Sequence, residues 1–279
     1  MVERYMLDRE LLEAEKIARV AGRILLELYE TDYTVAFKSK SDPVTEADTR
    51  ANTYIVDALR TAFPDDGIVA EESEDRSDAL RGGRCWYVDP LDGTKEFIAK
   101  NGEFAVMLGL AIEGVSTLGV VYRPVDDKLY AGVVGAGAEI EVGGLRTALR
   151  VSDTADTERL RLVVSRSHRG QPIDDVMDRL KISKETASGS VGLKVGLITE
   201  QRADLYIHMS NKSSAWDACG PEAILKAAGG RFTDLAGRAY HYGGTDMRND
   251  RGILACNANA FEAVLPVVQD VARRVGFLS

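Results

Sequence analysis

The sequence is poor in cysteine: Cys85, Cys219 and Cys256 are the only three in 279 residues. No two of them form a Cys-x-x-Cys pair, so the spacing indicates neither a disulfide framework nor a zinc site. Each cysteine lies in an apolar or small-residue segment, which predicts three buried structural thiols. The cysteine content fits a reducing compartment, and we expect a cytoplasmic protein.

Long apolar runs and an excess of cations are missing as well. No stretch of about 18 or more uninterrupted apolar residues occurs, and residues 1–10 lack the apolar core of a signal peptide. Acidic side chains number 44 against 35 Lys and Arg, which gives a formal net charge of -9. We therefore expect no integral membrane segment and no polymeric nucleic acid as partner, although a local basic pocket for a small anion remains possible.

The length and composition predict a globular protein with two subdomains that share one cleft. Hydrophobic residues make up 45% and charged residues 28% of the chain, and 279 residues is near the length at which one core divides. Helical periodicity or a capping pattern predicts helices over residues 7–28, 45–63, 173–180, 193–199, 221–228 and 260–275, and a further helix that begins at residue 95. Apolar runs between turn residues predict strands over residues 67–72, 85–88, 104–112, 116–122, 128–134, 161–165, 203–208 and 252–256.

Residues 147–157 are polar and mark the expected boundary between the two subdomains. Residues 1–150 are predicted to form an α+β subdomain with an antiparallel sheet. Strands and helices alternate in residues 151–279, which indicates an α/β subdomain.

Acidic residues stand at four element boundaries, at Asp48, Glu71, the pair Asp89 and Asp92, and Asp217. Two divalent metals that assist phosphoryl transfer need several oxygen ligands, more than one segment can supply. Each position also has a structural interpretation: Asp48 could complete a capping box with Thr45, Glu71 could be a surface acid, and Asp217 could cap a helix. The Asp89–Thr94 segment could be a solvated turn.

Taken together, these segments resemble the lithium-sensitive, magnesium-dependent phosphomonoesterase superfamily of inositol monophosphatases, fructose-1,6-bisphosphatases and bisphosphate nucleotidases. The signature of that family is an acidic pair, then Asp-Pro-(Ile/Leu)-Asp-(Gly/Ser)-Thr, then Trp-Asp. The matching segments occur in the same order and are Glu71-Glu72, Asp89-Pro90-Leu91-Asp92-Gly93-Thr94 and Trp216-Asp217, with Thr45-Glu46-Ala47-Asp48 upstream.

The resemblance implies a layered αβαβα sandwich of the sugar-phosphatase type, acting as a monomer or homodimer with two or three Mg²⁺ ions per site. It implies metal ligands at five positions: Glu71, Asp89, the Leu91 carbonyl, Asp92 and Asp217. Thr94, oriented by Asp48, resembles the pair that positions and deprotonates the attacking water. The backbone N–H groups of Gly93 and Thr94 would then bind the phosphate.

Further segments resemble the 3′(2′),5′-bisphosphate nucleotidases of this superfamily rather than the inositol monophosphatases. They are Lys95-Glu96-Phe97, Asn101-Gly102-Glu103-Phe104, Ser165-Arg166-Ser167-His168 and Gly189-Ser190 with Lys194. Ser165, His168, Ser190 and Lys194 are the implied nucleotide contacts, because a lysine suits a second phosphate and a histidine can stack on or hydrogen-bond a base. A surface histidine and a lysine on a helix face are the structural alternatives.

The leading hypothesis is a Mg²⁺-dependent hydrolase of 3′-phosphoadenosine 5′-phosphate, which yields AMP and phosphate. The alternative is an inositol monophosphatase or a broad sugar-phosphate phosphatase that acts on compounds such as fructose 1,6-bisphosphate. A non-catalytic sensor or scaffold with the same acidic site is disfavoured, since every position that the chemistry needs is filled.

Overall fold

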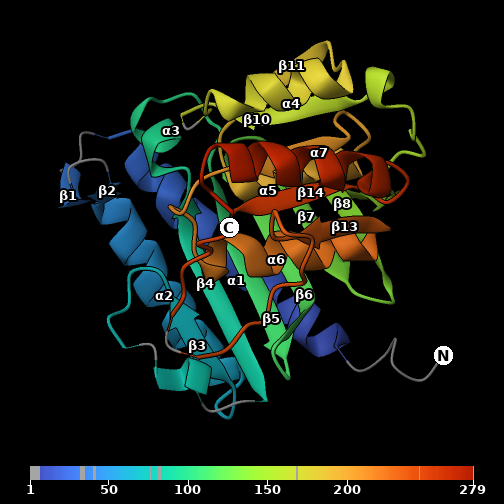
Figure 1. The fold of residues 1–279 in the computed structure, drawn as a ribbon. Helices are drawn as coiled ribbons and strands as arrows, with labels where there is room; N and C mark the ends of the chain where they lie inside the picture. The colour runs from blue at the N-terminus through green and yellow to red at the C-terminus, as the bar shows by residue number, and fades with distance from the viewer. Residues whose placement is uncertain are drawn as a thin grey trace.

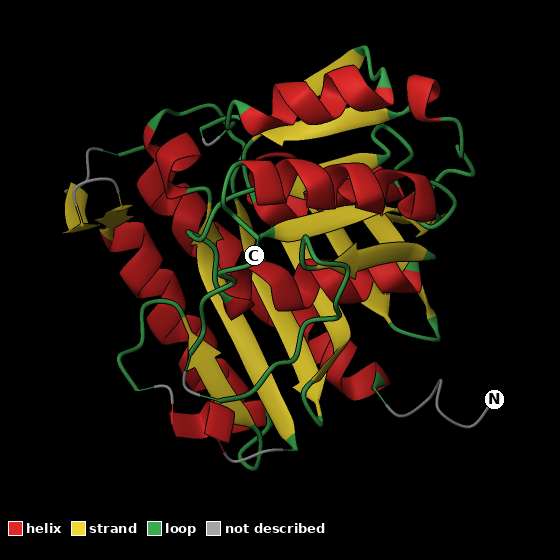
Figure 2. Ribbon diagram, in the orientation of Figure 1, coloured by secondary structure: helices red, strands yellow, loops and turns green. Residues whose placement is uncertain are grey.

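The computed structural model describes residues 7–31, 35–39, 42–75, 77–80, 83–167, 169–244 and 246–278. Two β-sheets lie between layers of helices, in the order helix, sheet, helix, sheet, helix (Figures 1 and 2). One outer layer holds α1 and α2, the middle layer holds α5 and α6, and the other outer layer holds α4 and α7. This is the layered αβαβα sandwich that the motifs predict.

The N-terminal layer confirms two predicted helices. Helix α1 spans Asp8–Tyr29 and buries an apolar stripe, and α2 spans Glu46–Ala62. Thr45 and Asp48 form the predicted capping box at the start of α2. The segment before α2, expected to be a polar loop, instead contains the antiparallel strands β1 (Val35–Ser39) and β2 (Asp42–Thr45).

Seven strands form the larger sheet in the order β3-β4-β5-β6-β7-β8-β9. The pair β3 and β4 is parallel and the other pairs are antiparallel. The antiparallel neighbours β5, β6 and β7 confirm the antiparallel sheet predicted for residues 104–134. The strands span Gly67–Ala70, Arg84–Asp92, Ala105–Ile112, Val115–Arg123, Lys128–Val133, Gly137–Val142 and Leu145–Leu149. The last two were not expected, because most of their side chains are partly or fully exposed and leave no apolar alternation.

Five strands form the smaller sheet in the order β11-β10-β12-β14-β13. They span Lys184–Ser188, Arg161–Ser165, Leu205–His208, Ile253–Asn257 and Gly230–Thr233. Strand β10 pairs in parallel with β11 and β12, whereas β14 is antiparallel to β12 and β13. The polar edge strand β11 and the short β13 were not expected.

The remaining helices are α3 (Thr94–Ile98), α4 (Pro172–Leu180), α5 (Val191–Thr199), α6 (Ala215–Ala227) and α7 (Phe261–Arg274). Short 3-10 turns cover Ser77–Leu80, Pro124–Asp126 and Thr157–Arg159. The expected start of α6 at Pro221 is wrong, because the helix begins six residues earlier and holds that proline in its interior.

Helix α6 packs directly between the two sheets, and glycines allow the close approach. A Cβ atom on Gly119 of β6 would lie 2.0 Å from the carbonyl oxygen of Gly220 in α6. All three cysteines are buried, as expected. The division into subdomains at residue 150 stays a prediction. Among the described helices, none has both the length and the apolar character needed to cross a bilayer.

Candidate active site

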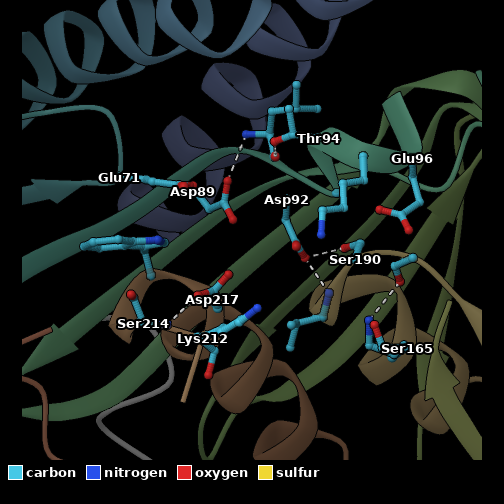
Figure 3. A pocket seen from close by; sticks show the side chains of 18 of the residues that line it. Glu71, Asp89, Asp92, Thr94, Glu96, Ser165, Ser190, Lys212, Ser214 and Asp217 are labelled. Atoms are coloured by element: carbon cyan, nitrogen blue, oxygen red, sulfur yellow. Dashed lines mark hydrogen bonds between the residues drawn. The ribbon is translucent and has the colours of Figure 1, made fainter. Parts of the chain in front are cut away.

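A cavity of about 500 Å³ opens where the end of β4 meets the first turns of α5 and α6 (Figure 3). Strands β10 and β12 of the smaller sheet contribute further lining residues. Elements far apart in the sequence thus contribute to one cavity. Eight sequence-predicted side chains line it: Glu71, Asp89, Asp92, Thr94, Ser165, Ser190, Lys194 and Asp217.

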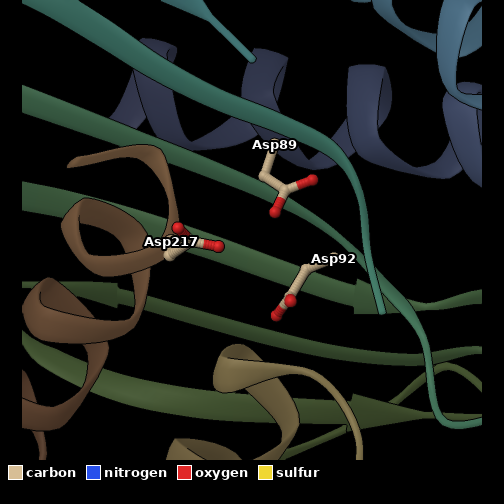
Figure 4. Close-up of side chains that lie close together, drawn as sticks. All are labelled: Asp89, Asp92 and Asp217. Carbon is tan, nitrogen blue, oxygen red and sulfur yellow. The ribbon is translucent and has the colours of Figure 1, made fainter. Parts of the chain in front are cut away.

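Three aspartates converge in this cavity. Asp89, Asp92 and Asp217 each offer a carboxylate oxygen, and these oxygens lie within 4.8 Å of one another. Figure 4 shows the three side chains around a common space. Burial raises the pKa of Asp89 and of Asp217, and repulsion from neighbouring carboxylates raises both further. Buried carboxylates that repel one another fit a hard divalent cation, which prefers oxygen ligands and would neutralise them.

Asp92 is held by the first turn of α5. Its Oδ2 atom accepts hydrogen bonds from Ser190 Oγ at 2.6 Å, from Val191 N at 2.5 Å and from Gly192 N at 3.3 Å. Burial raises the pKa of Asp92, and the ammonium of Lys194 partly offsets that effect. Three donors on Oδ2 leave Oδ1 available to a cation.

Asp217 lies in the first turn of α6, not before a helix as expected. Ser214 N donates to Asp217 Oδ2 at 2.5 Å, and the two residues form a capping box. The capping interpretation of Asp217 is therefore correct, and its position beside Asp89 and Asp92 shows that a cap can also belong to the acidic group.

Asp48 and Thr94 form a hydrogen-bonded pair at one edge of the cavity. Thr94 Oγ1 lies 3.1 Å from Asp48 Oδ1 and 3.3 Å from the Leu91 carbonyl oxygen. Asp48 Oδ2 accepts from Thr45 N at 2.7 Å and from Thr45 Oγ1 at 2.6 Å. Burial raises the pKa of Asp48 to about 6 despite these hydrogen bonds. Asp48 is thus both a helix cap and the partner of Thr94.

The backbone of the Asp89–Thr94 segment is ordered by its own contacts. Leu91 N donates to Asp89 Oδ1 at 2.9 Å, which fixes the first carboxylate. Strand β4 continues to Asp92 with an irregular register after Asp89, so the expected strand end at residue 88 is wrong. Gly93 has φ +97°, a conformation that favours glycine, and it precedes α3. Glu71, at the end of β3, is half-buried and lines the cavity.

The ammonium of Lys194 is buried in the opposite wall, with the residue only 2% exposed. Its Nζ atom donates to the Gly189 carbonyl at 3.2 Å and lies 5.1 Å from the centre of the Tyr206 ring. Burial lowers the pKa of Lys194, against the attraction of Asp92 and Glu96. Lys194 does lie on helix α5, as the structural alternative has it, but it is buried and lines the cavity.

The other implied nucleotide contacts differ in their placement. Ser165 lines the cavity at the end of β10, and Ser190 Oγ is engaged by Asp92 and by the amide of Leu193. His168 lies outside the described residues.

Sequence reasoning did not assign four further cavity residues, Glu96, Tyr206, His208 and Lys212. Glu96 is buried and accepts a hydrogen bond from Ser167 Oγ at 2.5 Å. Tyr206 and His208 belong to β12, which ends at His208, and Lys212 follows four residues later, shortly before the Trp-Asp motif. Ligands of α/β sheets often bind beyond the carboxyl ends of strands, and this signal could have identified them.

A family model described as the inositol monophosphatase family matches residues 7–273. The 3′(2′),5′-bisphosphate nucleotidase CysQ of Escherichia coli (strain K12) is 36% identical over 230 residues, which cover 81% of this chain and 91% of that protein. The 3′(2′),5′-bisphosphate nucleotidase 1 of Dictyostelium discoideum is 28% identical over 289 residues, with 88% and 91% covered.

Solved structures show the same fold. An IMPase of Thermotoga maritima superposes with a TM-score of 0.78 at 27% identity, covering 94% of this chain and 98% of that chain. CysQ from Bacteroides thetaiotaomicron, described as a bacterial member of the inositol monophosphatase family, has a TM-score of 0.73 at 29% identity, covering 90% and 97%. These likenesses confirm the predicted sandwich fold.

Proposed function

The chain belongs to the inositol monophosphatase family and is a phosphatase, and from this premise we propose that it hydrolyses 3′-phosphoadenosine 5′-phosphate to AMP and phosphate with Mg²⁺. The observation that carries the proposal is one cavity that holds three clustered carboxylates, of which Asp89 is buried and Asp92 and Asp217 are half-buried, together with the buried ammonium of Lys194. The carboxylates suit a hard cation and the ammonium suits a second phosphate. The names of the E. coli and D. discoideum relatives support a nucleotide substrate.

The proposed magnesium ligands are the carboxylates of Glu71, Asp89, Asp92 and Asp217 and the carbonyl of Leu91. All five residues line the cavity. Magnesium bound there supplies activation of water and neutralises charge on the phosphoryl oxygens during in-line displacement.

Thr94 and Asp48 are proposed to handle the proton of the attacking water. Thr94 Oγ1 is within hydrogen-bonding distance of Asp48 Oδ1, so a proton taken at Thr94 can pass to this carboxylate. A pKa of about 6 suits Asp48 to such a role near neutral pH. Across the whole reaction, the hydroxyl of water joins phosphorus and the ribose oxygen keeps the bonding pair of the broken ester bond and takes a proton.

The reacting phosphate is proposed to bind the backbone N–H groups of Gly93 and Thr94, and the second phosphate to bind Lys194. An ammonium has three donors, and among the described residues Lys194 Nζ uses one of them to donate to the Gly189 carbonyl. Ser165 is a proposed contact of the nucleoside. Ser190 is proposed to act mainly by orienting Asp92, because its hydroxyl already donates to that carboxylate.

A side-by-side kinetic assay tests the proposal. Phosphate release is measured from 3′-phosphoadenosine 5′-phosphate, its sulfated analogue, inositol 1-phosphate and fructose 1,6-bisphosphate, with Mg²⁺ and with EDTA. We expect the bisphosphate nucleotide to have the highest kcat/KM and EDTA to abolish its hydrolysis. Much faster release from inositol 1-phosphate would favour the sugar-phosphatase alternative instead.

The Asp92→Asn variant locates the activity. This change keeps the size of the side chain and removes its charge, so we expect loss of Mg²⁺-dependent phosphate release. Release that persists unchanged in the variant would show that the acidic group is not the source of activity.

A further inference from the structure

The backbone of Glu103 lies between two glycine turns that face the cavity. A Cβ atom on Gly93 would come within 2.9 Å of the Glu103 carbonyl oxygen, and one on Gly189 would come within 2.4 Å of the same atom. Gly93 follows Asp92, and Gly189 precedes α5 by two residues. The Glu103 segment therefore sets the spacing between these two turns.

The side chain of Glu103 binds the second turn directly. Its Oε2 atom accepts a hydrogen bond from Gly189 N at 2.7 Å. Arg166 donates to both carboxylate oxygens, from Nε and from its terminal nitrogen, at 2.6 Å each. Arg166 also donates to the Ala187 carbonyl at 3.0 Å. Burial disfavours the charged carboxylate, but the hydrogen bonds from Arg166 and Gly189 outweigh it and lower the pKa of Glu103.

The Gly189–Ser190 turn, which Glu103 binds, contacts both Asp92 and Lys194. Ser190 has φ +44°, which is unusual for a residue with a side chain and needs support from its surroundings. In this conformation Ser190 Oγ and Val191 N reach Asp92, and the Gly189 carbonyl accepts from Lys194. Neither Glu103 nor Arg166 lines the cavity itself.

We propose that Glu103, locked by Arg166, is a positioning residue: it holds the Gly189–Ser190 turn so that Asp92 and Lys194 face the cavity in a fixed arrangement. This proposal rests on the proposed function, in which Asp92 binds Mg²⁺ and Lys194 binds the second phosphate. Glu103 itself touches neither substrate nor cation.

The test compares Glu103→Gln with Glu185→Gln. Glu185 is likewise bound by an arginine, Arg169, and its carboxylate accepts hydrogen bonds from that side chain rather than from the Gly189–Ser190 turn. Hydrogen–deuterium exchange reports on the amides of residues 189–192, and calorimetry with Mg²⁺ alone reports on Asp92. Steady-state kinetics with the bisphosphate nucleotide separates KM from kcat.

We expect Glu103→Gln to speed exchange at residues 189–192, to weaken Mg²⁺ binding and to raise KM, each by about tenfold, since charge-assisted hydrogen bonds are lost. The kcat at saturating Mg²⁺ and substrate should change much less. Glu185→Gln should leave all of these values unchanged. Unaltered exchange, Mg²⁺ affinity and KM in Glu103→Gln would overturn the proposal, as would equal effects in the control.

A second variant keeps the test decisive if Glu103→Gln folds poorly. Arg166→Gln leaves Glu103 in place to accept from Gly189, so we expect smaller changes in the same direction; no change in exchange would contradict the proposal. Exchange and Mg²⁺ calorimetry do not depend on the substrate. They therefore still test Glu103 if the wild-type protein releases no phosphate from the nucleotide, a result that would refute the proposed function alone.

Discussion

Replacing Lys194 with methionine tests how the cavity distinguishes a bisphosphate from a simple monoester. The change keeps an unbranched side chain of similar length and removes the positive charge. In the structure the residue is 2% exposed, and Nζ is held by the Gly189 carbonyl and the Tyr206 ring. We expect the metal-free variant to be less stable to heat, because Asp92 and Glu96 lose the attraction of the ammonium.

The expected effect on binding follows from the lost contact. A hydrogen bond to a charged group is worth about 1.5–3 kcal/mol, which corresponds to a loss of about 10- to 150-fold in affinity. The low exposure of Lys194 favours the upper part of this range. A substrate without a second phosphate does not make this contact, so its kcat/KM should change little.

The assay compares kcat/KM for 3′-phosphoadenosine 5′-phosphate and inositol 1-phosphate. Lys194 also lowers the pKa of Asp92, so both substrates must be measured at Mg²⁺ concentrations that saturate each variant. Lys212→Met is the comparison variant, because this lysine lines the same cavity but is exposed and should contribute less. Equal losses on both substrates in Lys194→Met would refute the assignment of this lysine to the second phosphate.

Three further outcomes follow from the site and its packing. Thr94→Val should lower kcat by about 10²- to 10⁴-fold, the usual range for proton-transfer groups, and leave calorimetric Mg²⁺ affinity unchanged; an unaltered kcat would exclude a role for the hydroxyl. Burial raises the pKa of Asp48 to about 6 and also raises that of Asp89 and of Asp217. The metal-free protein therefore loses stability as pH rises from about 4 to the folded-state pKa values, because in that range the unfolded state releases protons that the folded state keeps. For Asp48 alone the full loss is about 3 kcal/mol, and about half of it falls above pH 5, so the melting temperature in EDTA should fall from pH 5 to pH 8 while the gain on adding Mg²⁺ rises; equal melting temperatures would contradict this. Gly119→Ala places a methyl group 2.0 Å from the α6 backbone and should cost at least about 1–3 kcal/mol in denaturant unfolding, whereas a neutral result would argue against the close packing of α6.

The chemistry of the site could be predicted from the sequence because each motif is local. Asp89, Asp92 and Thr94 lie within six residues, and the residue types alone suggest a cation and a phosphate. The partners that orient them could not be predicted in the same way. Ser190 and Asp92 are 98 residues apart, and Glu103 and Arg166 are 63 apart, so only the fold shows that they meet.

Two of the missed strands share a physical cause. Strand β11 (Lys184–Ser188) is largely exposed at a sheet edge, and β9 is exposed over most of its length, so neither carries the alternation that identifies a strand. Pro221 led to the wrong helix start, because proline is typical of a first helical turn. In the structure it lies inside α6, next to the glycine that contacts β5 and β6.

The acidic group also shows why its arrangement depends on the whole fold. Desolvation raises the pKa of all three carboxylates, and Asp92 also raises the pKa of Asp89 and of Asp217, so the group opposes folding and other contacts must hold it. Each carboxylate accepts a hydrogen bond from a main-chain amide: Asp89 from Leu91 at 2.9 Å, Asp92 from Val191 at 2.5 Å and Asp217 from Ser214 at 2.5 Å. These amides belong to β4 and to the starts of α5 and α6, three elements that meet only in the folded chain. Because rigid backbone rather than mobile side chains orients the carboxylates, a cation would meet ligands that need little rearrangement, and binding would lose little free energy to ordering.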